Sequence, residues 1–126
     1  MTHWALPLIG QPWTPERNCW WLVRHVFKER LGIDLPIVQV GSAGDQSGVI
    51  REASQTSGWR PCAVTDPREF DVALMQGPLG PHIGVMISAN GFIGLLHNLE
   101  DVGVTFQKLS EVKSIGYRNF EFWRHA

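Results

Sequence analysis

The sequence predicts an α+β domain in which an N-terminal helix packs on a mainly antiparallel sheet. Three observations lead to this class: an amphipathic helical repeat near the N-terminus, a series of short apolar or alternating runs in the second half, and a strong hairpin signal between two of those runs. The chain has 126 residues, 44% of them hydrophobic, which is enough for one core of ordinary size. We therefore expect a single domain over residues 1–126.

The helix is expected over residues 18–31. Its apolar stripe repeats at i, i+3, i+4, i+7 and i+8, through Cys19, Leu22, Val23, Val26 and Phe27. Asn18 is a good N-cap, and Gly32 suits the position just past the last turn. Cys19 therefore lies in the first turn of the predicted helix.

The stretch over residues 41–58 is rich in glycine, serine and glutamine, so we interpret it as a surface excursion, with a short helix expected over residues 49–54. The apolar runs that follow are separated by turn residues and predict a meander of strands. These runs cover residues 71–76, 82–88, 92–97, 103–108 and 117–124.

The hairpin is the best determined element, because Asn90-Gly91 between two apolar runs is typical of a two-residue type I′ turn. With that turn, His97 lies opposite Gly84, and His82 lies two residues further along the same strand. Both histidines then face the same side as diagonal neighbours, so that one imidazole can reach the other. A loop longer by one residue would put them on opposite faces.

These elements predict a thiol and imidazole site. A cysteine in the first turn of a helix lies at the positive end of the helix dipole, which favours the thiolate. His82 would serve as the base, and a neutral His97 would accept its hydrogen bond and hold it in the right tautomer. Backbone N–H groups at the helix start, including that of Cys19, would meet the negative charge on an attacked carbonyl.

These residues have two other possible uses, a zinc site and a disulfide. Cys19, His82 and His97 are suitable zinc ligands, but the sequence lacks the closely spaced cysteine or histidine pairs of structural zinc sites. Cys19 could pair with Cys62, but a chain without a signal peptide is expected to stay in a reducing compartment. We therefore expect no metal, no cofactor and no disulfide, with Cys62 a small buried thiol.

Composition excludes further classes of function. The 11 basic and 12 acidic residues give a formal charge of -1, which leaves no basic surface for nucleic acid. No apolar stretch is long enough to span a bilayer, and the N-terminus lacks the pattern of a secretion signal. We expect a protein made in the cytoplasm, with no membrane insertion and no nucleic-acid partner.

Several segments resemble the NlpC-type cell-wall cysteine peptidases, above all the short forms associated with phage tail assembly. In the order of the chain they are Ile9-Gly10-Gln11-Pro12-Trp13, Asn18-Cys19-Trp20-Trp21-Leu22-Val23-Arg24, Phe70-Asp71-Val72-Ala73-Leu74-Met75, Pro81-His82-Ile83-Gly84-Val85-Met86-Ile87, Gly94-Leu95-Leu96-His97 and Phe122-Trp123-Arg124. The second resembles the family's Asp-Cys-Trp-Gly-Leu-Val form of the nucleophile motif, and the fourth its His-Val-Gly-Ile strand.

The resemblance spans nearly the whole chain and implies a papain-like fold with a Cys-His-His triad. Cys19, His82 and His97 take the catalytic roles, and Trp13, Asn18 and Trp20 are expected to contact the substrate. The implied reaction is hydrolysis of peptide bonds in peptidoglycan stem peptides, commonly between D-glutamate and diaminopimelate. The implied partners are peptidoglycan peptides and phage tail proteins, which suits a phage or prophage enzyme.

The sequence departs from the family pattern at the nucleophile. Asn18 replaces the aspartate of the motif, Trp20 and Trp21 replace small residues, and Trp13 stands where many relatives have a tyrosine. The alternative is therefore a structural tail-assembly protein that keeps the peptidase fold without its chemistry.

Overall fold

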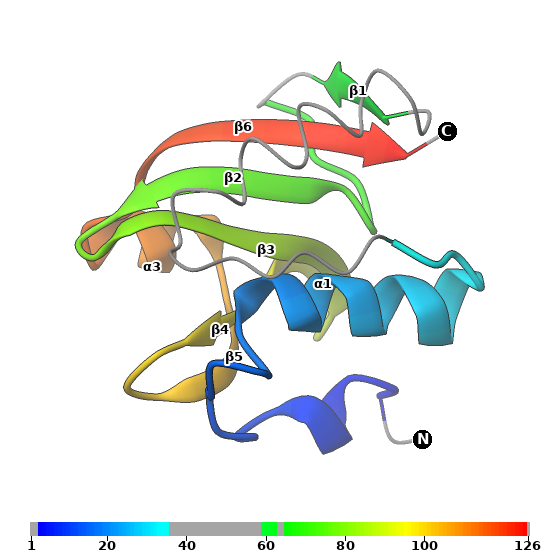
Figure 1. Ribbon diagram of the computed structural model, residues 1–126. Coiled ribbons are helices and arrows are strands. Elements are labelled where there is room, and N and C mark those ends of the chain that lie inside the picture. The colour runs from blue at the N-terminus through cyan, green and yellow to red at the C-terminus, as the bar shows by residue number, and fades with distance from the viewer. Residues whose placement is uncertain (1–2, 36–58, 63–64, 126) are drawn as a thin grey trace.

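The computed structural model describes residues 3–35, 59–62 and 65–125 of the chain. The surface excursion and short helix expected within residues 41–58 lie outside these ranges. The predicted class is confirmed: the chain is α+β, with one antiparallel sheet and the helix that begins at Cys19 packed on it (Figure 1).

The N-terminal part supplies the helix. A short 3-10 turn, η1 (Leu6–Leu8), precedes α1 (Cys19–Val26), which continues as one π-helical stretch, η2 (Phe27–Leu31). The predicted N-cap is confirmed, because Oδ1 of Asn18 accepts a hydrogen bond at 3.0 Å from a backbone N–H of the first turn. The predicted end is confirmed as well: Gly32 has φ 67°, the left-handed conformation in which glycine bears no Cβ penalty.

Six strands lie in the described part of the chain. They are β1 (Trp59–Cys62), β2 (Val72–Gly77), β3 (Gly80–Ala89), β4 (Phe92–Leu99), β5 (Gly103–Gln107) and β6 (Arg118–His125). β6, β2, β3, β4 and β5 form five consecutive antiparallel strands, and β1 adds a sixth at the β6 edge. The five runs predicted from the sequence correspond to β2 to β6, with ends that differ by a few residues.

A second helix, α3 (Leu109–Ser114), lies between β5 and β6 and was not expected from the sequence. It is six residues long and has two apolar positions on its inner side, Leu109 and Val112, too few to give a periodic signal. Its start is held by the side chain of Glu111, whose Oε1 accepts a hydrogen bond from the backbone N–H of Lys108 at 3.0 Å.

The predicted hairpin is confirmed in its register. Asn90 and Gly91 have φ values of 55° and 83°, as a type I′ turn requires. Ala89 then pairs with Phe92, and further along the ladder Gly84 pairs with His97. The β3–β4 hairpin therefore presents its side chains on the faces that the two-residue turn dictates.

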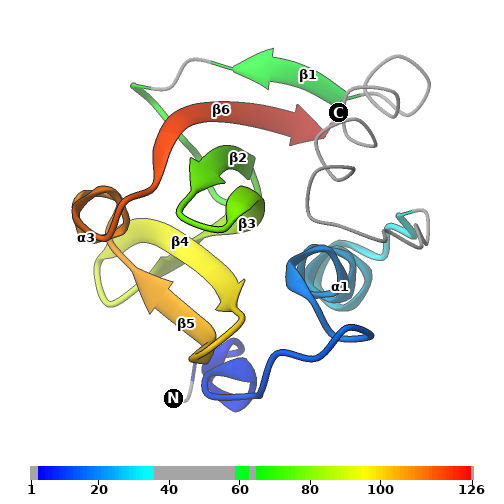
Figure 2. The same cartoon turned by 60° about the vertical axis from the view of Figure 1, so that its left-hand side comes forward.

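Helices cover both faces of the sheet (Figure 2). On the face covered by α1, residues such as Ile83, Val85 and Leu96 pack with the apolar stripe of the helix. On the face covered by α3, Met86 and Leu95 pack with Val112. Because side chains alternate along a strand, neighbours on β3 and β4 belong to different cores.

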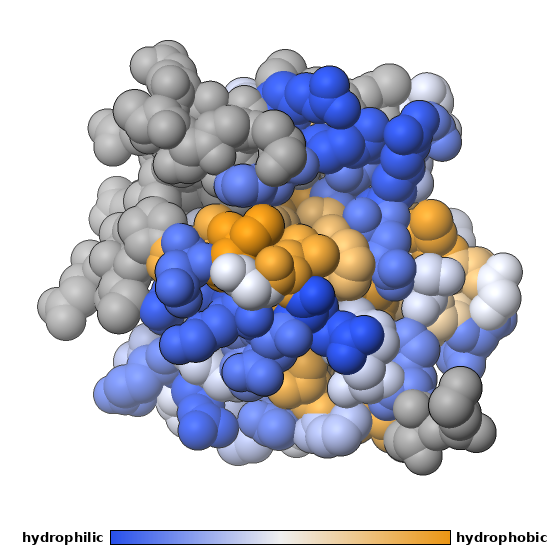
Figure 3. Space-filling view, turned by 90° about the vertical axis from the view of Figure 1, so that its right-hand side faces the viewer, coloured by the Kyte–Doolittle hydropathy of each residue, from blue (hydrophilic) through white to orange (hydrophobic). Residues whose placement is uncertain are grey.

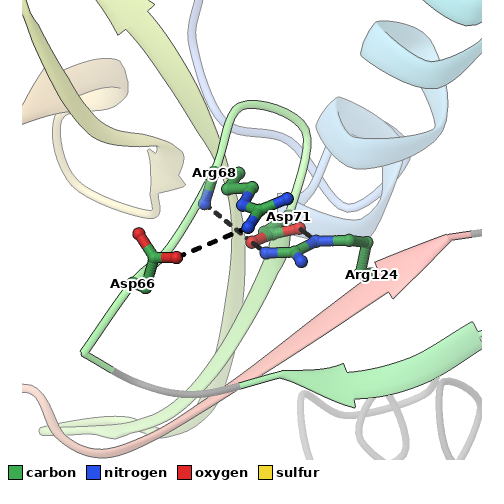
Figure 4. A network of polar contacts seen from close by, with 4 residues as sticks. All are labelled: Asp66, Arg68, Asp71 and Arg124. Carbon is green, nitrogen blue, oxygen red and sulfur yellow. Dashed lines mark hydrogen bonds and ion pairs between the residues drawn. The ribbon is translucent and has the colours of Figure 1, made fainter.

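An ion pair ties the last strand to the start of β2 (Figure 4). Asp71, 1% exposed, accepts two hydrogen bonds from Arg124, at 2.8 Å from Nε and 2.7 Å from Nη2. Its Oδ2 also accepts the backbone N–H of Arg68 at 2.7 Å, and the Arg68 guanidinium lies 3.6 Å from Asp66. A two-pronged pair of this kind fixes the relative position of the two segments.

At the end of the molecule where η2 lies, apolar side chains are exposed between charged ones (Figure 3). Leu31, at the end of η2, is 39% exposed.

Among the helices in the described ranges, none combines the length and apolar character that crossing a membrane requires.

Candidate active site

Two histidines and one glutamine form a continuous polar chain across three neighbouring strands. Nε2 of His82, near the start of β3, lies 3.0 Å from Nδ1 of His97 on β4. Nε2 of His97 lies 2.9 Å from Oε1 of Gln107, at the end of β5. The prediction that the two imidazoles meet is confirmed, and the glutamine extends their chain by one residue.

The amide oxygen of Gln107 sets the direction of these hydrogen bonds. Oε1 can accept but not donate, so the proton of His97 must be on Nε2. A neutral His97 then has an unprotonated Nδ1, which accepts the N–H of His82 Nε2. By the same logic, a neutral His82 carries its lone pair on Nδ1. The chain therefore presents one basic nitrogen, Nδ1 of His82, at the end remote from Gln107.

Burial keeps both imidazoles neutral over the physiological pH range. Burial, together with a smaller contribution from His97, lowers the pKa of His82 to about 3. Burial also lowers the pKa of His97 to about 4, although its hydrogen bond to Gln107 acts in the opposite direction. His97 is 0% exposed, so its polar atoms depend on these two protein partners.

Cys19 lies where the sequence predicts, as the first residue of α1. It is 5% exposed and packs in the apolar cluster between α1 and the sheet, together with Leu22 and Ile83. The helix begins with the dipole orientation that favours a thiolate at this position.

The two imidazoles occupy strand positions that alternate with the positions packed against Cys19. His82 pairs with Met75 and shares the α3 face with it, whereas Ile83 faces α1 with Cys19. His97 likewise lies opposite Gly84, on the α3 face. Within residues 3–35, 59–62 and 65–125, no three histidine, cysteine or acidic side chains gather closely enough to hold a metal ion.

Asn98 holds the start of α1 against one end of the sheet. It follows His97 on β4 and points to the opposite side, where its Nδ2 donates to the carbonyl oxygens of Arg17 at 2.7 Å and Asn18 at 3.4 Å. Asn98 is 1% exposed. The start of α1 is thus fixed beside the end of β4, which lies next to the start of β3. Cys19 and His82 therefore occupy the same end of the sheet.

Tyr117 is a second link between them. Its ring centroid lies 5.0 Å from that of His82 and 5.9 Å from that of His97. Burial raises the pKa of Tyr117, and Asp101 and Cys19 raise it further by charge repulsion of the phenolate. The sulfur therefore lies within electrostatic range of the phenol that contacts both imidazoles.

The three residues expected to contact substrate have different surroundings. The side chain of Asn18 is engaged as the N-cap of α1. Trp20 is 3% exposed and belongs to the apolar cluster under α1, so the structure gives its indole a packing role. Trp13 is partly exposed in the loop that precedes the helix. Trp13 and Asn18 are both partly exposed, so only Trp20 of the three is buried.

Three residues of this region were missed by sequence reasoning: Gln107, Asn98 and Tyr117. Gln107 could have been found, because the alternation of a third strand placed beside β4 puts it on the histidine face. Asn98 gives a weaker signal, a polar residue at the end of an apolar run. Tyr117 gave none, since its position depends on α3, which the sequence pattern did not reveal.

A surface hollow of about 240 Å³ lies elsewhere, between the N-terminal segment and α1, with Trp4, His25 and Arg30 among its lining residues. None of the predicted site residues lines it. No protein-family model matches the sequence, and no curated protein matches it.

Proposed function

We propose that this protein is a papain-like cysteine peptidase that hydrolyses peptide bonds in peptidoglycan stem peptides, as part of a phage or prophage tail. The observation that carries the proposal is the hydrogen-bonded chain from Gln107 through His97 to His82, with distances of 2.9 and 3.0 Å. A buried chain of this kind leaves one imidazole nitrogen oriented as a base, which is what a thiol nucleophile needs. The resemblance of the sequence motifs to NlpC-type peptidases supplies the substrate class.

In the proposed reaction, Nδ1 of His82 takes the proton of the Cys19 thiol as the sulfur attacks the carbonyl carbon. The S–H bond breaks, an S–C bond forms, and backbone N–H groups at the start of α1 stabilise the oxyanion. His82 then returns the proton to the leaving amine. Water, deprotonated by the same imidazole, hydrolyses the thioester and restores the thiol. No cofactor or metal takes part in these reaction steps.

The low pKa of His82 determines the protonation state of the proposed Cys19–His82 pair before reaction. An imidazole with a pKa of about 3 is neutral at pH 7, so the resting pair is thiol and imidazole. His82 acts as a general base during attack, which differs from the resting thiolate that the position of Cys19 in the first helical turn predicts. His97 and Gln107 assist by keeping His82 in the tautomer with its lone pair on Nδ1.

The test is hydrolysis of purified muropeptides, followed by separation of the fragments. We expect release of fragments by the wild type and loss of that release in Cys19→Ala, with circular dichroism unchanged. Cys62→Ser is the matched control, because it also removes a thiol and should keep the activity. Wild-type-like cleavage by Cys19→Ala would refute the assignment of the nucleophile.

A second candidate function is structural: a tail-assembly protein that keeps this fold without catalysis. The burial of Cys19 favours it, because a thiol that is 5% exposed in an apolar cluster resembles a small core residue. Thiol alkylation as a function of pH separates the two candidates. If His82 assists ionisation of the Cys19 thiol as a general base, Cys19 should react much faster than Cys62, whereas slow, equal reaction of both thiols would favour the structural role.

A further inference from the structure

Tyr117 is built into the region of the imidazole pair, although the proposed reaction does not use it. It is the single tyrosine of the chain and lies between α3 and β6. Its ring is tilted by 50° to that of His82 at 5.0 Å and meets His97 edge-on at 5.9 Å. Gly77 leaves the space that the ring occupies, because a Cβ there would lie 2.5 Å from Cε1 of Tyr117.

An aromatic ring beside the imidazole pair can stabilise the pair when His82 becomes charged. During attack, His82 carries a positive charge in a site whose burial disfavours that charge. The groups that contact the pair include Gln107 on β5 and the ring of Tyr117, both uncharged at neutral pH. Asp101 and Cys19 lie within electrostatic range of the Tyr117 hydroxyl. An aromatic ring whose centroid lies within about 6 Å of a cation attracts it through the ring quadrupole.

We propose that Tyr117 is a positioning residue whose ring holds the imidazole pair in place and stabilises His82 while it carries the proton taken from Cys19. The inference rests on the proposed function for its role in catalysis. The proton balance is that of the attack step: the S–H bond of Cys19 breaks and an N–H bond forms on Nδ1 of His82. No electron transfer and no further reactant is involved.

The ring and the hydroxyl of Tyr117 have different surroundings, so they can be tested separately. Asp101 and Cys19 act on the hydroxyl, whose ionisation they oppose, so the phenol stays neutral. The ring contacts the imidazoles. Tyr117→Phe removes the hydroxyl and keeps the ring, whereas Tyr117→Leu removes both. If the proposal is right, the two variants must behave differently.

The kinetic experiment measures kcat/KM against pH on muropeptides for wild type, Tyr117→Phe and Tyr117→Leu. We expect the phenylalanine variant to stay within about twofold of wild type and the leucine variant to fall by roughly 2- to 30-fold, with a shifted acid limb. Phe120→Leu is the matched control: it removes a partly buried aromatic ring that packs against the same cluster, and should leave the acid limb unchanged. If leucine variants fail to fold, Tyr117→Met replaces the ring with an unbranched chain. Equal profiles for the phenylalanine and leucine variants would overturn the proposal.

An NMR measurement at pH 7 separates this inference from the proposed function. In the Cys19→Ala background, ¹⁵N NMR should show His82 in the single tautomer with its proton on Nε2 for both Tyr117 and Tyr117→Phe, and a mixture of the two tautomers for Tyr117→Leu. Loss of this difference refutes the role of the ring even in an active enzyme. If the wild type cleaves nothing while the difference persists, the peptidase assignment fails and the stabilisation of His82 by Tyr117 stands.

Discussion

Two buried polar networks in the same sheet differ in charge: one is an ion pair and the other is made of neutral groups. The first joins Asp71 and Arg124 as a charged pair, in which each carboxylate oxygen accepts one guanidinium hydrogen bond. The second joins His82, His97 and Gln107 through neutral groups. In the charged network the carboxylate and the guanidinium balance each other's charge, whereas the neutral network ends in a nitrogen oriented as a base.

The difference shows what each network can do. A buried ion pair with matched hydrogen bonds tolerates neither the loss of a partner nor a change of charge, so it suits a fixed junction between segments. A neutral imidazole chain can accept a proton at one end and pass the effect along its length. The two networks also lie on different strands: Asp71 precedes β2 and Arg124 lies on β6, whereas the histidine–glutamine chain crosses β3, β4 and β5.

The largest expected effect breaks the neutral network at its basic end. In His82→Asn, the side chain is still polar but has no basic nitrogen, so kcat/KM on muropeptides should fall by about 10² to 10⁴. Ile83→Val is the control on the adjacent residue, which faces α1: it should keep the activity and lose about 0.5–1.5 kcal/mol of stability. Retention of activity in His82→Asn would remove His82 from the mechanism.

Breaking the charged network should act on stability instead. Arg124→Met leaves the carboxylate of Asp71, 1% exposed, without its guanidinium partner. The free energy of unfolding in urea should fall by about 3–5 kcal/mol. Asp71→Leu combined with Arg124→Met should recover part of that loss, because no buried charge remains. A double variant as unstable as Arg124→Met alone would show that the pair is not the cause.

The third effect, which is the smallest when counted for one histidine over one pH unit, tests the comparison through pH. The unfolded chain protonates both histidines near pH 6.5, whereas burial lowers their folded pKa values to about 3 and about 4. Between these limits the unfolded state binds more protons, so stability falls as the pH falls below 6.5. The loss should be about 1.4 kcal/mol per pH unit for each histidine. Urea unfolding from pH 7 to pH 5 measures it, and His82→Gln/His97→Gln should lack this slope. An equal slope in both proteins would contradict the assignment.

The sequence predicted the parts of this molecule that local rules determine. The turn at Asn90-Gly91 dictated which strand positions face each other, and so placed His82 beside His97. The N-cap and the glycine past η2 followed from the preferences of Asn18 and Gly32. In each case, a short-range conformational requirement selected the residue types.

The parts that were missed depend on contacts between distant segments. The position of Tyr117 under the imidazoles follows from α3, a helix too short to have a period. Phe70 has φ 70°, a conformation that glycine adopts more readily, so its residue type does not predict it. The sequence also left undecided which sheet face is the core, and the structure has apolar clusters on both.

The number of residues in the turn between β3 and β4 is a condition for the proposed chemistry, because it determines which side chain of β4 lies beside His82. One residue inserted in this turn would shift the β3–β4 register by one position. The side chain of Leu96 or Asn98 would then lie beside His82 in place of His97. Surface loops elsewhere accept insertions at small entropic cost. In a library of random insertions, variants that fold but carry a longer turn should have no peptidase activity. Homologues with a longer turn could therefore keep the fold and lose the proposed activity.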